Sequence, residues 1–227
     1  MRMSSAKTNT RASDSRHLTT YYSDYTVKWA TLDWELDQAF SLRRRVFCGE
    51  QGIFDDDDRD EIDDRAQLLV AVANHGGWHE KIVGTVRIHQ ESPGVWWGSR
   101  LAVDKAFRSQ IGLGSVLIKL AVSSANAVGC SQFLAQVQKR NETLFQRLNW
   151  ESKFELMVKN HPHVMMDANL SEYPPCYQPT SGFVVRGQQP APIADVSIPY
   201  LAGYSTSHSI ANSAASTRQQ AQTLRAS

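Results

Sequence analysis

The sequence predicts an α/β domain in which a mixed, mostly antiparallel sheet of six to seven strands carries helices on both faces, with a flexible tail at each end. Between residues 25 and 170, segments with the alternating apolar pattern of strands interchange with segments of helical periodicity. Residues 101–138 supply a strand, a helix and a second strand, which is the crossover that a parallel pair in such a sheet requires. Residues 1–24 are polar and aperiodic, and residues 171–227 hold six of the eight prolines, so we expect both ends to be disordered.

Composition narrows the class of protein. Lys and Arg number 24 against 23 Asp and Glu, so no net field favours nucleic acid or an anionic membrane. No apolar run approaches the roughly 20 residues that span a bilayer, and the first 20 residues lack the apolar centre of a secretory signal. Cys48, Cys130 and Cys176 form no metal-ligand spacing and are typical of reduced thiols. We therefore expect a cytoplasmic protein without a metal, a nucleic-acid partner or a membrane partner.

The first half of the domain predicts a strand, a helix and a hairpin. Residues 25–30 alternate apolar and polar side chains, as a strand does. Asp33 is a good N-cap for a helix whose apolar positions share one face, and the arginines at 43–45 suit the dipole at its far end. After an acidic loop, residues 67–73 and 81–89 are two β-rich runs joined by a glycine-containing turn, which predicts a hairpin.

The second half predicts the crossover and a closing pair of strands. Apolar side chains with i, i+3, i+4 spacing predict the crossover helix, and Gly129 ends it. The expected elements are strand 94–103, helix 113–128, strand 131–138, helix 142–148 and strands 154–158 and 163–167.

The turn "RSQIGLGS" at residues 108–115 joins the third strand to the crossover helix. The first amides of a helix have no intrahelical acceptor and carry partial positive charge, so a phosphate suits this position, and Gly112 and Gly114 allow close approach. The alternative is that these glycines serve only the turn. The P-loop pattern fails because Ser115 follows Gly114, and the dinucleotide pattern fails because Leu117 stands where a third glycine is needed.

The turn and its neighbours resemble the acyl-CoA loop of the GNAT family of N-acetyltransferases. The strand Leu101-Ala102-Val103 precedes the Gly-x-Gly turn, and "NETLFQRLNW" at residues 141–150 is similar to a later segment of that family. The resemblance covers residues 25 to about 170. Arg108 stands one position too early for the family's pattern, which a one-residue insertion in the loop would explain.

A closer resemblance is to bacterial N-acetyltransferases linked with nitrogen starvation and nitrilase gene clusters. It is carried by "RRVFCGEQGIF" at residues 44–54 and "GCSQFLAQVQ" at residues 129–138. This likeness implies a role in nitrogen metabolism.

The family resemblance implies a site for acetyl-CoA or another short acyl-CoA. Backbone groups of Leu101 and Val103 would pair with the pantetheine arm, the amides of residues 110–115 would hold the pyrophosphate, and Asn141 would lie near the thioester. The implied cofactor-binding residues are Leu101, Ala102, Val103, Arg108, Ser109, Gln110, Ile111, Gly112, Leu113, Gly114, Ser115, Asn141 and Phe145.

Acetyl transfer to an amine needs a base, a donor for the oxyanion and a proton for the departing thiolate. The tyrosine that many family members use as the acid reads Phe145 here, and phenylalanine has no proton to give. The resemblance implies that a backbone N–H near residues 102–104 meets the oxyanion. Glu50 is the first candidate for the base, with an exposed loop carboxylate as the alternative reading. His163 is the second, with a simple hydrogen-bonded histidine as its alternative.

The acceptor side is expected to involve Arg87, which can orient a carboxylate, and the acidic run at residues 54–64. Calcium does not suit that run, because an EF-hand register puts Glu61 or an arginine where the loop needs glycine or a ligand. Two readings remain: a solvated loop, or a cluster in which Asp60, Glu61 and Asp63 attract a cationic amine.

The resemblance therefore implies an N-acetyltransferase that moves an acetyl group directly, in a ternary complex, to a small amine or amino-acid-like acceptor. It also allows a homodimer. Two alternatives remain. The "E-I-D" segment, the arginine at 87 and "SRLAV" at residues 99–103 resemble acyl-homoserine-lactone synthases, although those enzymes generally lack the Gly-x-Gly turn. A non-catalytic acyl-CoA-binding module is the other alternative, because Phe145 replaces the usual acid.

Overall fold

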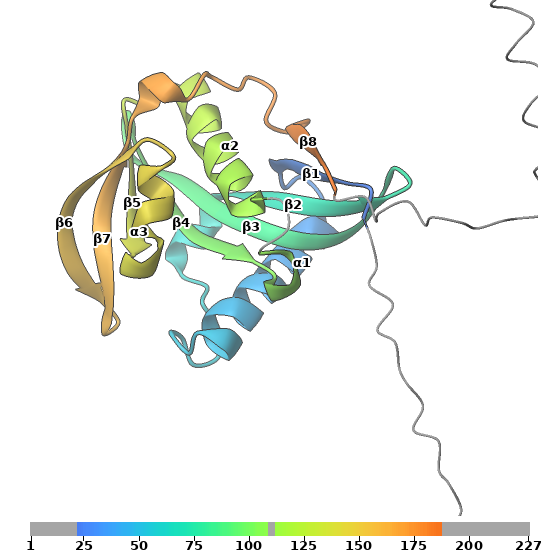
Figure 1. Ribbon diagram of the computed structural model, residues 1–227, viewed down its shortest axis with the longest axis horizontal. Coiled ribbons are helices and arrows are strands. Elements are labelled where there is room, and N and C mark those ends of the chain that lie inside the picture. The colour runs from blue at the N-terminus through green and yellow to red at the C-terminus, as the bar shows by residue number, and fades with distance from the viewer. Residues whose placement is uncertain (1–21, 109–111, 188–227) are drawn as a thin grey trace, which may run out of the picture. The chain divides into compact units, whose positions relative to one another are not determined.

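The computed structural model describes residues 22–108 and 112–187, and it contains an eight-stranded sheet (Figure 1). The order of the strands across the sheet is β6-β7-β5-β4-β3-β2-β1-β8, and every neighbouring pair is antiparallel except β4 and β5. The strands are β1 (Asp24–Trp29), β2 (Gln67–His75), β3 (Trp78–Ser92), β4 (Val95–Val103), β5 (Gln132–Gln138), β6 (Trp150–Val158), β7 (His161–Ala168) and β8 (Phe183–Arg186). The predicted α/β class and the mixed, mostly antiparallel sheet are confirmed.

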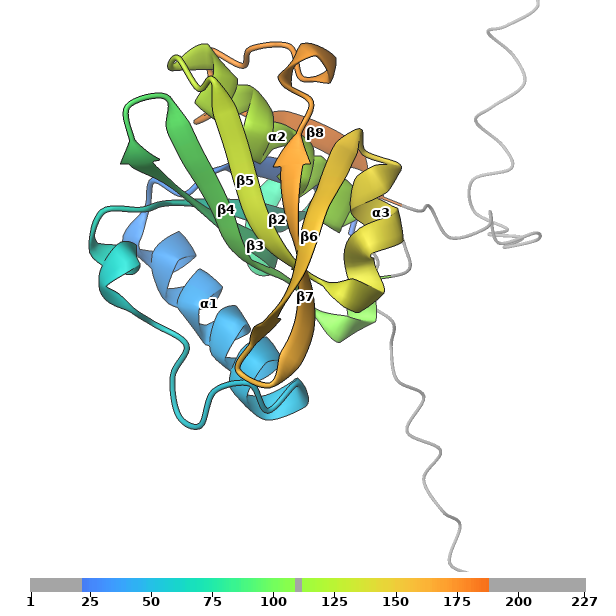
Figure 2. The same cartoon turned by 90° about the vertical axis from the view of Figure 1, so that its left-hand side faces the viewer.

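Helices cover both faces of the sheet, as predicted (Figures 1 and 2). One core lies between the sheet and α1, and a second, larger core lies between the opposite face and α2 with α3. The α-helices are α1 (Asp33–Arg44), α2 (Leu113–Ala127) and α3 (Glu142–Gln146). Short turns of other helix types are η1 (Arg45–Glu50), η2 (Glu61–Asp64), η3 (Lys105–Phe107), η4 (Lys139–Asn141) and η5 (Leu170–Glu172).

The start of α1 differs from the expected cap. Leu32 is the N-cap residue and Asp33 is already helical. A buried carboxylate does the work of the cap, because Glu35 accepts hydrogen bonds from the backbone amides of Thr31 and Leu32 at 2.8 and 3.2 Å. Lys28 of β1 pairs with the same carboxylate at 2.8 Å, so the helix is tied to the strand before it.

The end of α1 also differs from the expected dipole arrangement. Arg43 is fully buried and belongs to an ion-pair cluster rather than to the solvated end of the helix. The helix then widens into the π-turn η1 (Arg45–Glu50), which continues the apolar face through Val46 and Phe47. The apolar face was correctly predicted, whereas the role of Arg43 was not.

Helix α2 begins and ends at the predicted glycines. Gly112 is the N-cap in a left-handed conformation with φ +65°, and Gly129, just past the C-cap, also has a positive φ of +88°. Both conformations strain residues with a side chain, so the two glycines fix where the crossover helix starts and stops.

The parallel pair β4 and β5 is joined for only part of its length. Residues 95–98 of β4 pair with residues 132–135 of β5, and beyond Gly98 these two strands do not pair with each other. Between its pairings with Arg87 and Thr85 of β3, β4 contains one residue more than β3, and Arg100 in this bulge has φ +54°. The sheet is therefore open between β4 and β5.

The ordered chain continues past the predicted domain end at residue 170. Tyr173 is buried and its hydroxyl accepts a hydrogen bond from the Trp150 indole at 3.0 Å, while β8 pairs with β1 and becomes one edge of the sheet. The sequence placed this segment in the disordered tail, whereas residues 171–187 pack on the sheet. The physical reason is that β8 is held by backbone pairing with β1, which needs no strong apolar pattern of its own.

Candidate functional site

A cavity of about 850 Å³ lies at the opening between β4 and β5. Six of the predicted site residues line it, and they come from the loop after α1, from β3, β4 and β7, and from the segment around α3. These six residues are Asp60, Arg87, Leu101, Asn141, Phe145 and His163. Elements far apart in the sequence thus meet at one site.

His163 is the candidate base that reaches the cavity. It is 8% exposed, and its Nδ1 lies 2.8 Å from the carbonyl oxygen of His161. A carbonyl can only accept, so Nδ1 carries a proton in this contact. In the neutral ring Nε2 then holds the lone pair that a base needs.

Glu50, the other candidate base, lies at the end of η1 and is not among the residues that line the cavity. Its carboxylate pairs with Arg108 at 2.6 Å, and Arg108 also donates to the Val103 carbonyl at 2.8 Å. The structure therefore brings Glu50 to the loop that precedes α2. Arg108 links that loop to the end of β4.

The amino end of α2 has the features of an anion site. The amides of Ser115 and Val116 donate the first hydrogen bonds within α2, both to the Gly112 carbonyl. The amides of Leu113 and Gly114 come before them in the first turn, where a helix offers no acceptor. A Cβ on Gly114 would meet only Val103 Cγ2, at 3.9 Å, so the approach to these amides is open. The donors fit the pyrophosphate of a CoA ester. The predicted residues Ser109, Gln110 and Ile111 lie outside the described residues.

The outer edge of β4 is left without a strand partner beside the cavity. Ala102 and Val103 pair with Thr85 and Gly84 of β3, while the edge of β4 that faces β5 has no strand partner from residue 99 onward. The Val103 carbonyl on this edge accepts from Arg108, and backbone groups of an edge that no strand occupies can pair with an extended amide-bearing chain. Leu101 lines the cavity between the two strands.

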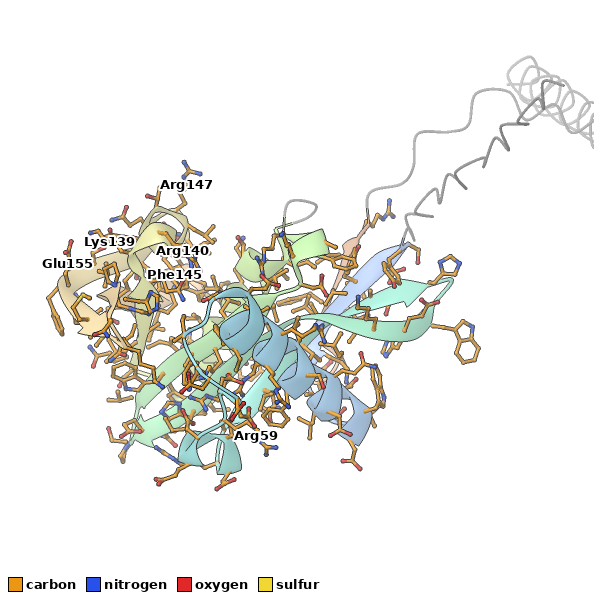
Figure 3. The ribbon with its side chains drawn as sticks, turned by 90° about the horizontal axis from the view of Figure 1, so that it is seen from below. Arg59, Lys139, Arg140, Phe145, Arg147 and Glu155 are labelled. Atoms are coloured by element: carbon orange, nitrogen blue, oxygen red, sulfur yellow. The ribbon has the colours of Figure 1, made fainter. Side chains whose placement is uncertain are left out.

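The far wall of the opening is aromatic. Phe145 of α3 is buried and packs edge-on against Trp150, with ring centroids 5.1 Å apart. Asn141, just before α3, lines the cavity nearby. Figure 3 shows Phe145 on the side of α3 that faces the strands, whereas Arg147 points away from the fold. No acidic proton is available from the Phe145 side chain.

The α1 face of the opening carries an ion-pair cluster of three arginines and three aspartates, called here the Arg/Asp cluster. Its members are Arg43, Arg87, Arg100, Asp58, Asp60 and Asp63. Asp63 is the centre of the cluster, since it pairs with Arg43 at 2.6 Å and with Arg87 at 2.9 Å. Asp58 joins Arg43 and Arg100, at 2.8 and 2.9 Å. The three positive and three negative charges balance.

The Arg/Asp cluster changes the acidity of its carboxyls. Burial opposes the ionisation of Asp63, but hydrogen bonds and charge from Arg43, with the charge of Arg87, outweigh it and lower the pKa to about 2. Asp60 follows the same pattern: burial raises its pKa, and Arg87 and Arg100 bring it below the ordinary value. Both aspartates are therefore ionised at neutral pH and already have cationic partners.

The predicted acceptor residues are arranged differently from the expectation. Arg87 is 1% exposed and donates to Asp60 and to the Ser99 hydroxyl, so its guanidinium is already occupied. Glu61 is exposed and does not line the cavity. Sequence reasoning also missed Arg43 and Arg100. No local signal in the sequence marks these two arginines, because each alone resembles a solvated charge.

Two exposed cations border the cavity without a carboxylate partner among the described residues: Arg59 and Lys159. Arg59 stacks on the Phe40 ring at 4.2 Å, and Lys159 lies over the Phe54 ring at 4.0 Å. Figure 3 shows Arg59 beside α1. The acid Asp57 also lines this mouth of the cavity.

His89 lies on the same side as the Arg/Asp cluster. Burial lowers its pKa first, and the charges of Arg65 and Arg87 lower it further, against the opposing effect of Glu91. His89 is therefore a neutral ring at physiological pH.

Metal and membrane features can be stated for the part of the chain that the structure describes. Within residues 22–108 and 112–187, no group of three or more His, Cys, Asp or Glu side chains is arranged to hold a metal ion. No helix within the same residues has the length and apolar character needed to cross a bilayer.

Comparisons with known proteins agree with this geometry. The family described as "Acetyltransferase (GNAT) family" matches residues 28–150. The Bacillus subtilis (strain 168) protein BSU40680 is 28% identical over 145 residues, which cover 62% of this chain and 93% of that protein.

Two solved structures share the fold. A crystal structure from Lactobacillus plantarum has a TM-score of 0.57 at 20% identity, covering 64% of this chain and 98% of the other. The CoA-dependent acyl-homoserine lactone synthase BjaI, solved with SAM and isopentyl-CoA, has a TM-score of 0.54 at 17% identity, covering 66% of this chain and 86% of its own. At these identities the likeness concerns the fold.

Proposed function

The chain belongs to the acetyltransferase (GNAT) family, and from that premise we propose that it transfers a short acyl group, acetyl in the simplest case, from its CoA ester directly to the amine of a small amino-acid-like acceptor. Membership of the family makes the protein an acyl-CoA-dependent acetyltransferase. The nature of the acceptor, the direct transfer and the residues named below are the proposal.

One observation carries the proposal. At the cavity between β4 and β5, the edge of β4 has no strand partner, and the helix that follows β4 in the chain, α2, begins at a glycine turn. An unpaired edge suits the amides of pantetheine, and a helix N-terminus suits a pyrophosphate. The bound CoA ester supplies the activated acyl group. Residues of β4, the loop before α2 and α3 then position it.

His163 is the base that this arrangement supports best. Its protonated Nδ1 is held by the His161 carbonyl, which orients the ring and leaves Nε2 to take a proton from the acceptor's ammonium or amine. Glu50 is supported less, because its carboxylate already pairs with Arg108 outside the cavity lining. A backbone N–H near residues 102–104 remains the proposed donor to the oxyanion.

The departing thiolate needs a proton from elsewhere than residue 145, because Phe145 has none. We propose that the thiol leaves as a thiolate and is protonated by solvent at the open cavity, without a dedicated side-chain acid. Placement of the two substrates then supplies most of the acceleration.

An acceptor that carries a carboxylate is favoured by the charges at the mouth of the cavity. Arg59 and Lys159 are exposed there and have no carboxylate partner among the described residues, whereas Arg87 and Asp60 pair with each other. An amino acid could place its carboxylate on Arg59 or Lys159 and its amine toward the thioester. This moves the carboxylate-binding role from Arg87 to these two cations.

The first test is release of free thiol from acetyl-CoA with matched pairs of acceptors, each an amino acid and its decarboxylated amine. We expect the amino acid to react with a lower KM, and Lys159→Met to raise that KM more than the KM of the amine. Equal KM values for both members of every pair would contradict the amino-acid-like acceptor. No thiol release with any amine would contradict the transfer itself.

The cofactor site is tested by Gly114→Glu with Gly114→Ala as its matched control. A carboxylate in the first turn of α2 favours the helix, so the variant should fold as well as the wild type. Its charge opposes the pyrophosphate, and we expect acetyl-CoA to lose at least tenfold in affinity, measured by thermal protection. Gly114→Ala has room beside Val103 and should keep the protection. Full protection of Gly114→Glu would place the cofactor elsewhere.

We also propose that the chain belongs to the branch of the family linked with nitrogen starvation and nitrilase gene clusters, because of the motifs at residues 44–54 and 129–138. Membership of this branch would give the protein a cytoplasmic role in nitrogen metabolism. In the structure the first motif forms the end of α1 and η1, and the second forms β5, so both border the cavity through Phe47 and Val137. Thiol release with amino acids that store or carry nitrogen would test this role. A homodimer is tested by light scattering.

A second candidate function is acyl transfer to S-adenosylmethionine, as in acyl-homoserine-lactone synthases. The observation in its favour is the Arg/Asp cluster, in which Asp63 of the "E-I-D" segment pairs with Arg87, and to which Arg100 of "SRLAV" also belongs. Thiol release that requires S-adenosylmethionine and fails with every amino acid would favour it over the first proposal.

A further inference from the structure

We propose that the cavity contains a chamber for the acyl chain, on the α2 face of the sheet, that accepts linear or branched chains of several carbons in preference to acetyl. This inference rests on the proposed function, because it assumes that a CoA ester occupies the opening between β4 and β5. It goes further by naming the class of acyl donor.

The chamber is defined by six apolar side chains that line the cavity and yet are buried. They come from α2, β5, α3 and β6, and the most exposed of them, Ala135 and Phe145, show only 6% of their surface. The six residues are Ile118, Ala121, Phe133, Ala135, Phe145 and Trp150. Because these side chains line the cavity and are nevertheless buried, we infer that the cavity extends inward at this point. The extension passes between β4 and β5 into the core that lies against α2 and α3.

The floor of the chamber lies where β4 and β5 come together. Gly98 pairs with Ala135 at the last joined position, and a Cβ at Gly98 would come within 3.0 Å of Phe133 Cε1. Phe133 and Trp150 meet edge-on at 5.8 Å between centroids, and Phe145 extends the same aromatic surface. An acyl group that enters from the open end therefore meets small residues on the sides, Ala121 and Ala135, and aromatic rings at the end.

The chamber offers nothing polar to a ligand. The one polar atom among the six side chains, the Trp150 indole N–H, donates to the Tyr173 hydroxyl at 3.0 Å and is satisfied away from the cavity. Apolar cavities without polar partners hold water poorly and take apolar ligands instead. An acetyl group would leave much of such a surface uncovered, whereas each further methylene would cover more of it.

The chamber also accounts for Phe145, which the proposed reaction does not use. A tyrosine there would bring a hydroxyl to the aromatic wall, and that hydroxyl would need a partner once an acyl chain excluded water. Phenylalanine keeps the wall apolar. The residue that cannot serve as an acid is thus suited to contact the chain.

The test measures binding of a series of CoA esters to the full-length protein by thermal protection and calorimetry, with CoA, acetyl-, butyryl-, hexanoyl-, octanoyl- and isovaleryl-CoA. Burial of one methylene corresponds to about a fourfold gain in affinity, so hexanoyl-CoA should bind at least tenfold more tightly than acetyl-CoA. Thiol release with one acceptor should rank the esters in the same order by kcat/KM.

Ala121→Leu fills the chamber, and Ala127→Leu places the same substitution farther along α2, outside the residues that line the cavity. We expect Ala121→Leu to reduce the ratio of hexanoyl-CoA to acetyl-CoA affinity by at least tenfold and Ala127→Leu to leave the ratio unchanged. Ala135→Val, on β5, supplies an independent narrowing of the chamber if Ala121→Leu is unstable.

The outcomes separate the chamber from the site that it depends on. If acetyl-CoA binds and the affinity does not rise with chain length, the chamber is refuted and the proposed function stands. Unchanged ratios in both chamber variants would refute it equally. If no CoA ester binds, the proposed function is refuted and the chamber with it.

Discussion

At the scale of single residues, the Arg/Asp cluster borders the cavity with three positive and three negative charges that pair with one another. Arg43 and Arg87 are fully buried, and each finds two aspartates within hydrogen-bond distance. Such pairs are stable only when every charge has its partner, because an unpaired ion in the interior is costly. The cluster fixes the loop after α1 against β3 and β4, which shapes the α1 face of the cavity.

The cluster makes the stability of the fold sensitive to acid. The pKa of Asp63 in the folded chain is about 2, below the ordinary value of 3.8, so its contribution of about 2 kcal/mol is complete above pH 4 and is lost as the pH falls toward 2. We expect the free energy of unfolding, measured by urea titration, to fall across this window. A free energy that stays level from pH 4 to pH 2 would contradict the assignment.

Asp63→Asn should remove this acid dependence. It should also lower the free energy of unfolding by about 3 to 5 kcal/mol, because the buried guanidinium groups of Arg43 and Arg87 each lose one of their carboxylate partners. Asp64→Asn changes the neighbouring, exposed carboxylate and is the matched control, with an expected effect within about 0.5 kcal/mol.

His163 is the residue on which the proposed chemistry depends most. We expect His163→Gln to lower kcat by about 100-fold to 1000-fold, because glutamine fills the space but cannot act as a base. His161→Gln is the control, because the His161 backbone carbonyl that holds the ring survives the change. An unchanged kcat in His163→Gln would assign the base to another group.

At the scale of elements, the crossover β4, α2 and β5 was predictable and the shape of β4 was not. The helical spacing from residue 113 and the glycines at its two ends are local signals, and the structure starts and ends α2 where they indicate. The bulge at Arg100 depends on how β4 pairs with β3, and no local pattern announces one extra residue. The opening at the site therefore follows from pairing rather than from periodicity.

The attachment of β8 depends on a glycine that touches β1. A Cβ on Gly182 would lie 1.9 Å from the Val27 carbonyl oxygen, so Gly182→Ala must push β8 away from β1. Gly76 has a similar φ, +57° against +62°, and nothing lies within 4 Å of its Cβ position, so Gly76→Ala measures the backbone strain alone.

We expect Gly76→Ala to cost about 1 to 2 kcal/mol and Gly182→Ala clearly more, as measured by thermal unfolding. Faster hydrogen exchange in the amides of β8 should accompany the second change. Equal destabilisation by the two variants would mean that the contact between residue 182 and β1 does not affect the free energy of unfolding.

At the scale of the whole molecule, the sequence predicted the parts and the structure supplied the way they meet. Strands, helices and their order were predictable because apolar periodicity is local. The resemblance brought Asn141 and Phe145 into one candidate site, the search for a base added His163, and all three line the same cavity. The Arg/Asp cluster was not predictable, because residues 43 to 100 of the sequence supply its members and each alone looks like a solvated charge.

The last segment that the structure describes, residues 171–187, gives a prediction at the same scale. A chain that ends after Gly187 keeps Tyr173 and β8, and we expect its Tm to match that of the full-length protein. A chain that ends after Leu170 loses the hydroxyl that receives the Trp150 indole N–H and uncovers the outer edge of β1, so its Tm should fall by several degrees. Equal Tm values for the two truncated chains would show that residues 171–187 add nothing to the fold.

The bulge in β4 has a consequence for insertions and deletions in this strand. Its extra residue lets two consecutive side chains act on the α1 face: Ser99 accepts a hydrogen bond from Arg87, and Arg100 pairs with Asp58 and Asp60. Deletion of Arg100 would restore regular pairing of β4 with β3 and would keep Leu101 and Ala102 on their present faces of the sheet. It would also leave two buried arginines against three aspartates. Deletion of Arg100 would therefore destabilise the fold through the unbalanced charges of the Arg/Asp cluster, although the strand pairing would be kept.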